Sequence, residues 1–172
     1  MKGAEGTIKS RKKNMSLKVC IMAPDRVFWN AGADEIILPT NTGQMGVLPN
    51  HTPLITGLDI GVMLVRPEKG ASGAGQSPAV SSTGWISVAL MGGFALIKDN
   101  VVTILVNDAE LGSSIDPIGA EKAFNEAKES LDRAIAAGTS EGQDRAGRKE
   151  KIEASLAFKR ARARLQVVTQ GR

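Results

Sequence analysis

The chain has no tyrosine, 3% aromatic residues, one cysteine and one histidine among 172 residues. So few aromatic side chains leave almost no stacking platforms for bases, and no base-reading motif is present, so nucleic acid is not an expected partner. A single cysteine permits no internal disulfide, which fits a reducing compartment. Cys20 lies in the apolar run LKVCIMA, where we expect a small buried side chain.

Because His51 is the only histidine, catalytic triads and multi-histidine metal sites lack their partners. No GxxxxGK[ST] loop is present to hold a phosphate, and the carboxylates are scattered along the chain. The sequence therefore predicts no catalytic site, no metal site and no cofactor. We expect His51, between Asn50 and Pro53, to anchor a loop through hydrogen bonds.

Long apolar runs are also missing, and we expect no secretory signal, so membrane association is predicted only through a partner. The net charge of +4 is unevenly spread. The stretch from Phe158 to Arg172 carries five basic residues and no acidic one. In its segment FKRARARLQ, the cations flank an apolar stripe and form either a solvated face or a docking surface for an acidic partner.

Short β-branched runs separated by Gly, Pro, Asn and Asp fill the first two thirds of the chain. Leu17, Val19 and Ile21 alternate with less apolar residues, as in a half-buried strand. Asp99 and Asn100 separate two such runs and predict a tight hairpin turn. Gly92-Gly93 predicts a bulge or sharp bend. The spacing indicates an antiparallel β-sandwich or barrel.

After Val106 the apolar period changes from 2 to 3.6, which predicts helices. Asp116-Pro117 is a typical helix start, and Gly138 a stop. Two alanine-rich stripes, joined by a short polar connector, predict an antiparallel helical hairpin. Their members are Ala120, Phe124, Ala127, Leu131 and Ala134 or Ile135, then Ala154, Phe158, Ala161, Leu165 and Val168. Since alanines bury little apolar area, we expect this hairpin to be held weakly, to depend on contacts elsewhere and to be able to detach.

The predicted fold class is α+β, mainly β, with an N-terminal antiparallel β-sandwich followed by a C-terminal two-helix hairpin. Residues 1–14 are predicted as a disordered leader and 15–113 as the sandwich domain. Within it, 67–84 form a flexible hairpin-loop insertion rich in Gly and Ser. Residues 114–172 form the helix-turn-helix domain.

Several long blocks resemble the epsilon subunit family of rotary ATP synthases, in its chloroplast and cyanobacterial branch. These blocks are EIILPTNTGQMGVLPNHTPLITGLDIGVM, ALMGGFALI, VTILVNDAE, SIDP and AFKRARARLQVV. The resemblance implies a ten-stranded sandwich that binds the gamma subunit and the c-ring. It also implies a hairpin that extends into the alpha/beta catalytic head and inhibits ATP hydrolysis, with no catalytic residues of its own.

The implied location is the stromal face of the chloroplast thylakoid membrane, or the cytoplasmic face of the cyanobacterial thylakoid membrane. Two alternative functions stay open. The chain could be an adaptor that docks acidic proteins through its last helix, or a small-ligand module built on the GQMGVLPNHTP loop.

The resemblance also assigns residues. It implies a turn that contacts the c-ring, with Gln44 at its tip, formed by Asn41, Thr42, Gly43, Gln44, Met45 and Gly46. Pro49, Asn50 and His51 are the residues that would support this turn. The inhibitory contact with the beta subunit falls on Lys159, Arg160, Arg162 and Arg164. In the nucleotide-binding pattern of some bacterial relatives, Ile115, Asp116 and Ala120 match, but Gly119 replaces the arginine, so no nucleotide binding is expected.

Overall fold

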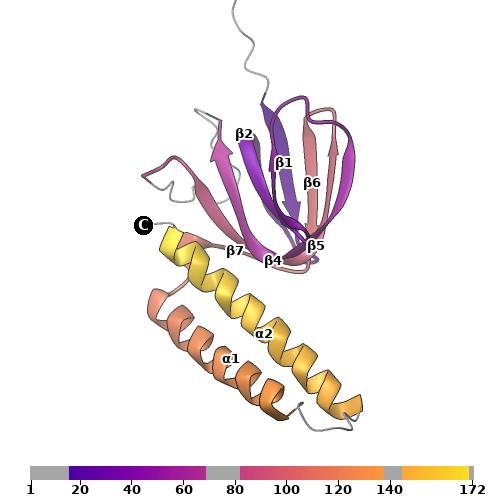
Figure 1. The fold of residues 1–172 in the computed structure, drawn as a ribbon. Helices are drawn as coiled ribbons and strands as arrows, with labels where there is room; N and C mark the ends of the chain where they lie inside the picture. The colour runs from indigo at the N-terminus through magenta and orange to yellow at the C-terminus, as the bar shows by residue number, and fades with distance from the viewer. Residues whose placement is uncertain (1–15, 69–81, 138–144, 171–172) are drawn as a thin grey trace, which may run out of the picture.

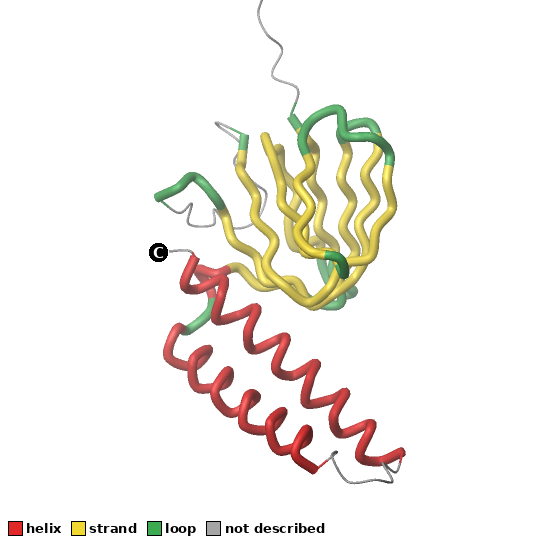
Figure 2. Tube along the Cα trace, viewed as in Figure 1, coloured by secondary structure: helices red, strands yellow, loops and turns green. Residues whose placement is uncertain are grey.

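A computed structural model of the chain describes residues 16–68, 82–137 and 145–170. Strands form the first part and two helices the last (Figure 1 and Figure 2). The predicted leader, most of the predicted 67–84 insertion and the predicted stop at Gly138 lie outside the described residues. In chain order the elements are β1 (Leu17–Met22), β2 (Val27–Thr40), β3 (Gly43–Val47), β4 (Leu54–Pro67), β5 (Ile86–Lys98), β6 (Val101–Val106), β7 (Ala109–Leu111), the 3-10 turn η1 (Gly112–Ser114), α1 (Pro117–Ala137) and α2 (Arg145–Gln170).

The strands form one sheet that closes on itself. Its order is β1-β6-β5-β4-β2-β3, with β7 paired to β5 and β1 also paired to β2. The predicted sandwich is confirmed, although the β1–β6 pair is parallel. The described residues form seven strands where the resemblance implies ten, because β2, β4 and β5 continue through irregularities for 14, 14 and 13 residues.

Strand alternation builds the core as the sequence predicts. Leu17, Val19 and Ile21 of β1 are fully buried. Cys20 is only half-buried, contrary to expectation, because it points to the opposite face of β1. Residues 86–91 of β5 are buried on both faces, so another element must cover the outer face of this strand.

The predicted hairpin turn and the predicted irregularity at Gly92-Gly93 are both present. Asp99 and Asn100 have φ values of 52° and 62°, and together they close the β5–β6 hairpin. Gly92 and Gly93, at φ 77° and 150°, mark the point where β5 changes its partner from β7 to β6. An ideal Cβ on Gly93 would lie 2.0 Å from the Leu105 carbonyl oxygen, so no larger residue fits there.

Helix α1 begins where the sequence predicts. The backbone amide of Gly119 donates to Oδ2 of Asp116 at 2.8 Å, so Asp116 caps the helix, and Pro117 is its first residue. The alanine seam is confirmed, with Ala120 and Ala134 of α1 buried and Ile135 43% exposed. On α2 the buried members of this seam are Ala154, Ala161 and Val168.

Helix α2 lies between α1 and the sandwich (Figure 1). The rings of Phe124 and Phe158 join the two helices, with their centroids 5.4 Å apart. On its other side, α2 packs against the outer faces of β4 and β5. This packing explains the burial of β5 on both faces. Because α1 packs mainly against α2, the hairpin is seated on the sandwich through α2.

Candidate interaction sites

The hairpin formed by β2 and β3 carries the residues assigned to the c-ring contact. Thr40 pairs with Gly43, so the turn itself is Asn41-Thr42. Gln44 is not at the tip as expected, because it pairs with Pro39 one step along β3. The Thr40 hydroxyl donates to the Gly43 carbonyl at 2.7 Å and fixes the turn. The six assigned residues are exposed apart from Met45, which is half-buried.

The loop of Pro49, Asn50 and His51 does not support that turn, contrary to the prediction. It follows the other end of β3, about 16 Å away at 3.3 Å per residue. There the Asn50 amide donates to Oδ1 of Asn100 at 2.6 Å, and Asn50 has a φ of 65°. His51 anchors the loop as expected, because its amide donates to Leu48 and its Nδ1 to the Thr52 carbonyl. Through Asn50, this loop is therefore bonded to the β5–β6 turn.

The four cations assigned to an inhibitory contact divide into two pairs. Lys159 Nζ donates to both carboxylate oxygens of Asp59, at 3.0 and 2.8 Å, and Arg164 donates to Oε1 of Glu110 through Nε and Nη2. Arg160 and Arg162 are exposed and form no ion pair with a residue in the described ranges. Half of the predicted contact surface is thus already engaged with the sandwich.

These ion pairs alter the acid–base behaviour of their members. The hydrogen bond from Lys159 holds the pKa of the Asp59 carboxyl below its ordinary value. The hydrogen bond to Glu110 raises the pKa of Arg164. The side chains remain between 27% and 45% exposed, so solvent screening limits each pair to about 0.2–1 kcal/mol.

Between the two ion pairs lies an apolar seat that the sequence analysis missed. Val62, Ala89 and Met91 of the sandwich pack against Ala163 and Val167 of α2. Val167 is fully buried. Burial of such a side chain contributes about 1.5–3 kcal/mol of free energy relative to its exposure to water. Ala163 and Val167 are four residues apart, which is the signal for a second helical stripe. The seat is far smaller than the sandwich core.

A second missed feature is an exposed apolar face on the sandwich. Ile55, Phe94, Leu96 and Leu105 are 72%, 64%, 43% and 52% exposed. Ile55 pairs with Leu96 and Phe94 with Leu105, so these side chains are neighbours on one side of β4, β5 and β6. We call these four residues the outer apolar face. A contiguous exposed apolar patch indicates a surface that another molecule covers.

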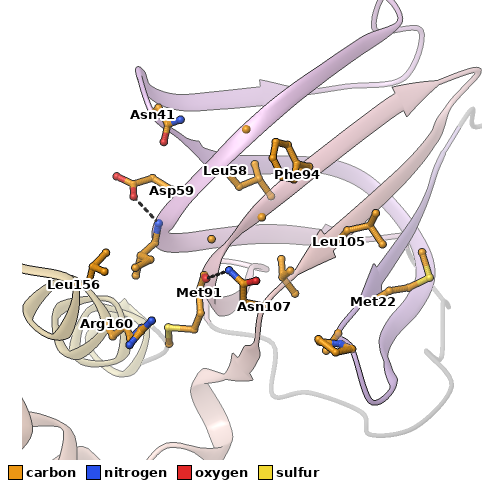
Figure 3. Close-up of a pocket in the computed structure, with 17 residues that line it drawn as sticks. Met22, Asn41, Leu58, Asp59, Met91, Phe94, Leu105, Asn107, Leu156 and Arg160 are labelled. Carbon is orange, nitrogen blue, oxygen red and sulfur yellow. Dashed lines mark hydrogen bonds between the residues drawn. The ribbon is translucent and has the colours of Figure 1, made fainter. Parts of the chain in front are cut away.

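Among the cavities lined by described residues, two border α2. The larger, of about 660 Å³, extends from Leu156 and Arg160 on α2 to Met22 and Leu105 on the sandwich, as Figure 3 shows. Phe94 also lines it, so it adjoins the outer apolar face. The smaller, of about 340 Å³, lies between the β2–β3 hairpin and α2, with Gln44 and Arg162 in its lining. Neither lining contains a histidine or cysteine.

The start of α1 bears on nucleotide binding. One carboxylate oxygen of Asp116 accepts the amide of Gly119, and an ideal Cβ on Gly119 would lie 2.9 Å from that oxygen. The Asp116 carboxylate therefore serves the helix end. Within the ranges that the structure describes, no three His, Cys, Asp or Glu side chains gather to hold a metal ion. No described helix has the length and apolar character needed to cross a membrane.

The fold defines a two-part protein, in which a helical hairpin is docked on a closed β-sandwich. The surfaces described above are its candidate sites of contact with other proteins. The chain belongs to the ATP synthase delta/epsilon chain family. Residues 16–112 match the family's beta-sandwich domain, and residues 113–169 match its long alpha-helix domain.

Named relatives cover nearly the same span. The chloroplastic ATP synthase epsilon chain of Tupiella akineta is 56% identical over 155 residues, which cover 90% of this chain and 100% of the relative. That of Chlorella vulgaris is 55% identical over 156 residues, covering 91% and 98%. Among solved structures, a chain of the Euglena gracilis mitochondrial ATP synthase aligns with a TM-score of 0.66 and 22% identity, covering 98% of this chain and 91% of that one. This last likeness concerns the fold alone.

Proposed function

We propose that this chain is the epsilon-type subunit of a chloroplast ATP synthase, a non-catalytic part of its rotating central stalk. This chain shares 56% and 55% of its aligned residues with two chloroplastic epsilon chains, over 100% and 98% of their length. This similarity supports the function and a chloroplast location. Within the chloroplast, we place it at the stromal face of the thylakoid membrane, attached through the complex.

The outer apolar face is the observation that carries the proposal. Four large apolar side chains on three adjacent strands stay in contact with water when the hairpin is docked. Their burial against another protein would remove this unfavourable exposure. We assign this face to the gamma subunit. The sandwich domain, residues 15–113, then holds the rotor shaft, while the hairpin domain, residues 114–172, keeps its freedom to leave its seat.

The β2–β3 hairpin serves in this proposal as the contact with the c-ring. Its exposed Asn41-Thr42 turn and Gln44 offer polar groups to a polar loop, and the Thr40–Gly43 hydrogen bond keeps the turn rigid. A stiff turn suits a contact through which torque passes. Asn41, Thr42, Gly43, Gln44, Met45 and Gly46 remain the residues of this contact.

The hairpin restrains ATP hydrolysis when it extends into the catalytic head. Lys159, Arg160, Arg162 and Arg164 then meet an acidic surface of the beta subunit. Its small apolar seat and two partly exposed ion pairs support a reversible attachment to the sandwich. No residue of this chain touches the reacting phosphate.

Binding to the gamma subunit tests the assignment. The purified full chain should co-migrate with the gamma subunit of a green-algal chloroplast ATP synthase. Phe94→Glu, in the outer apolar face, should weaken this binding at least tenfold, which is about 1.4 kcal/mol or more. The matched control is Ile118→Glu, because Ile118 is 79% exposed on α1 and lies outside the outer apolar face. Undiminished gamma binding by Phe94→Glu contradicts the assignment.

A further inference from the structure

The two ion pairs of α2 flank its apolar seat. At 100° per residue, Ala163 and Val167 lie between Lys159 and Arg164 around the helix axis. Lys159 meets Asp59 of β4, and Arg164 meets Glu110 of β7. The helix is therefore fixed on both sides of the seat, by two strands that are not neighbours in the sheet.

The sandwich positions both acidic residues, Asp59 through a backbone hydrogen bond and Glu110 through the register of its strand. The amide of Ile60 donates to Oδ1 of Asp59 at 2.8 Å, which orients this carboxylate toward α2. Glu110 sits in β7, opposite Ala89 of β5, and Ala89 is itself part of the seat. Such pre-positioned acceptors recognise an ammonium and a guanidinium with little further ordering.

We propose that Asp59 and Glu110 are positioning residues that hold α2 on the sandwich and compete with an acidic partner surface for Lys159 and Arg164. The inference rests on the proposed function, which supplies that partner as the acidic surface of the catalytic head. Each of these cations bonds either to the sandwich or to the partner. Arg160 and Arg162 carry no such restriction, because their side chains are exposed and form no ion pair within the described part of the chain.

This competition predicts opposite effects for the two halves of each ion pair. Neutral carboxylates should release the helix and leave its cations free, so inhibition of hydrolysis should increase. Neutral cations should also release the helix, but inhibition should fall, because the partner loses the same charges. A simple structural role for the ion pairs would give the same direction for both changes.

The helix position is measured in the isolated full chain, apart from any ATPase assay. Spin labels at Lys98→Cys and Lys151→Cys, in a Cys20→Ser background, report the distance between the sandwich and α2. Asp59→Asn with Glu110→Gln should lower the ratio of docked to released chains about two- to thirtyfold. The longer label distance should therefore become more populated. The matched control is Asp25→Asn with Asp99→Asn, which changes the net charge equally on exposed sandwich residues that form no ion pair with the described residues of α2.

Thermal unfolding of the sandwich shows that each variant is folded. The exchanged pair Asp59→Lys with Lys159→Asp is a second check. Because it keeps a cation and a carboxylate opposite each other, it should show the short distance of the native chain. Unchanged distances in Asp59→Asn with Glu110→Gln overturn the inference, whatever the ATPase shows.

The same variants are then added to an ATP synthase head that lacks epsilon. Longer distances with stronger inhibition support the inference. Longer distances with weaker inhibition contradict the competition for cations. If Asp59→Asn with Glu110→Gln gives longer distances but the native chain never inhibits, the role of Asp59 and Glu110 in holding α2 stands. The proposed function is then overturned.

Discussion

Gly112 and Val167 approach each other so closely that an ideal Cβ on Gly112 would lie 2.6 Å from Cγ1 of Val167. Gly112 belongs to η1, the turn that leads from the sandwich into the hairpin. Val167 is fully buried near the end of α2. The absence of a side chain at residue 112 therefore allows the hairpin to close onto the sandwich.

Gly112→Ala should push α2 away from its seat, at a cost of about 1–3 kcal/mol for an overpacked contact. Amide hydrogen exchange across residues 156–168 should become faster, because a helix without its packing partner frays. The control is Gly147→Ala, where the added methyl meets no atom within 4 Å and should stabilise α2 by about 0.5–1 kcal/mol. Equal exchange in native and Gly112→Ala chains would count against this seat.

The Asp59–Lys159 pair should make docking depend on acid. The pKa of Asp59 is lower in the folded chain than in the unfolded one, mainly through its hydrogen bond from Lys159. The stabilisation is therefore present above the unfolded value of about 3.9 and is lost as the pH falls through the lower folded pKa. In a carboxyl NMR titration, Lys159→Met should raise the pKa of Asp59 toward its ordinary value. An unchanged titration would show that Lys159 does not hold this carboxylate in solution.

The Asn50–Asn100 bond should contribute to sandwich stability. Asn100→Gly keeps the backbone at φ 62° but removes the acceptor of the Asn50 amide, for a loss of about 1 kcal/mol. Asn100→Ala should lose about 1–2 kcal/mol more, because alanine resists positive φ. Denaturant unfolding at equilibrium separates the two effects. Both variants unfolding like the native chain would exclude this contribution.

The full chain should not bind ATP at millimolar concentration in a calorimetric titration. Gly119 supplies no cation for the phosphates, and the Asp116 carboxylate caps α1 instead. Heat of binding that saturates in the millimolar range or below would refute this prediction.

Local features of the fold could be predicted from the sequence. Strand alternation identified Leu17, Val19 and Ile21 as core, and Asp99-Asn100 as a hairpin turn, because both depend on adjacent residues. Asp116-Pro117 identified the helix start for the same reason. The alanine stripes correctly predicted how α1 meets α2.

Features that depend on distant residues could not be predicted. Lys159 and Asp59 are 100 positions apart, so nothing local indicates that they meet. The register of β3 against β2 moved Gln44 off the tip, and strand length placed Pro49, Asn50 and His51 at the far end of β3.

The outer apolar face carried a local signal, since Phe94 and Leu96 alternate with the core residues Ala95 and Ile97, so both sides of this part of β5 are apolar.

The central claim is that the hairpin restrains ATP hydrolysis through the exposed cations of α2. Its most direct measurement is the hydrolysis rate of a chloroplast ATP synthase head without epsilon, at saturating concentrations of three chains. They are the native chain, Arg160→Ala with Arg162→Ala, and the control Arg148→Ala with Lys151→Ala, which removes two exposed cations nearer the start of α2. The native and control chains should suppress hydrolysis, and the Arg160/Arg162 variant should suppress it several-fold less. Undiminished hydrolysis with the native chain would contradict the claim.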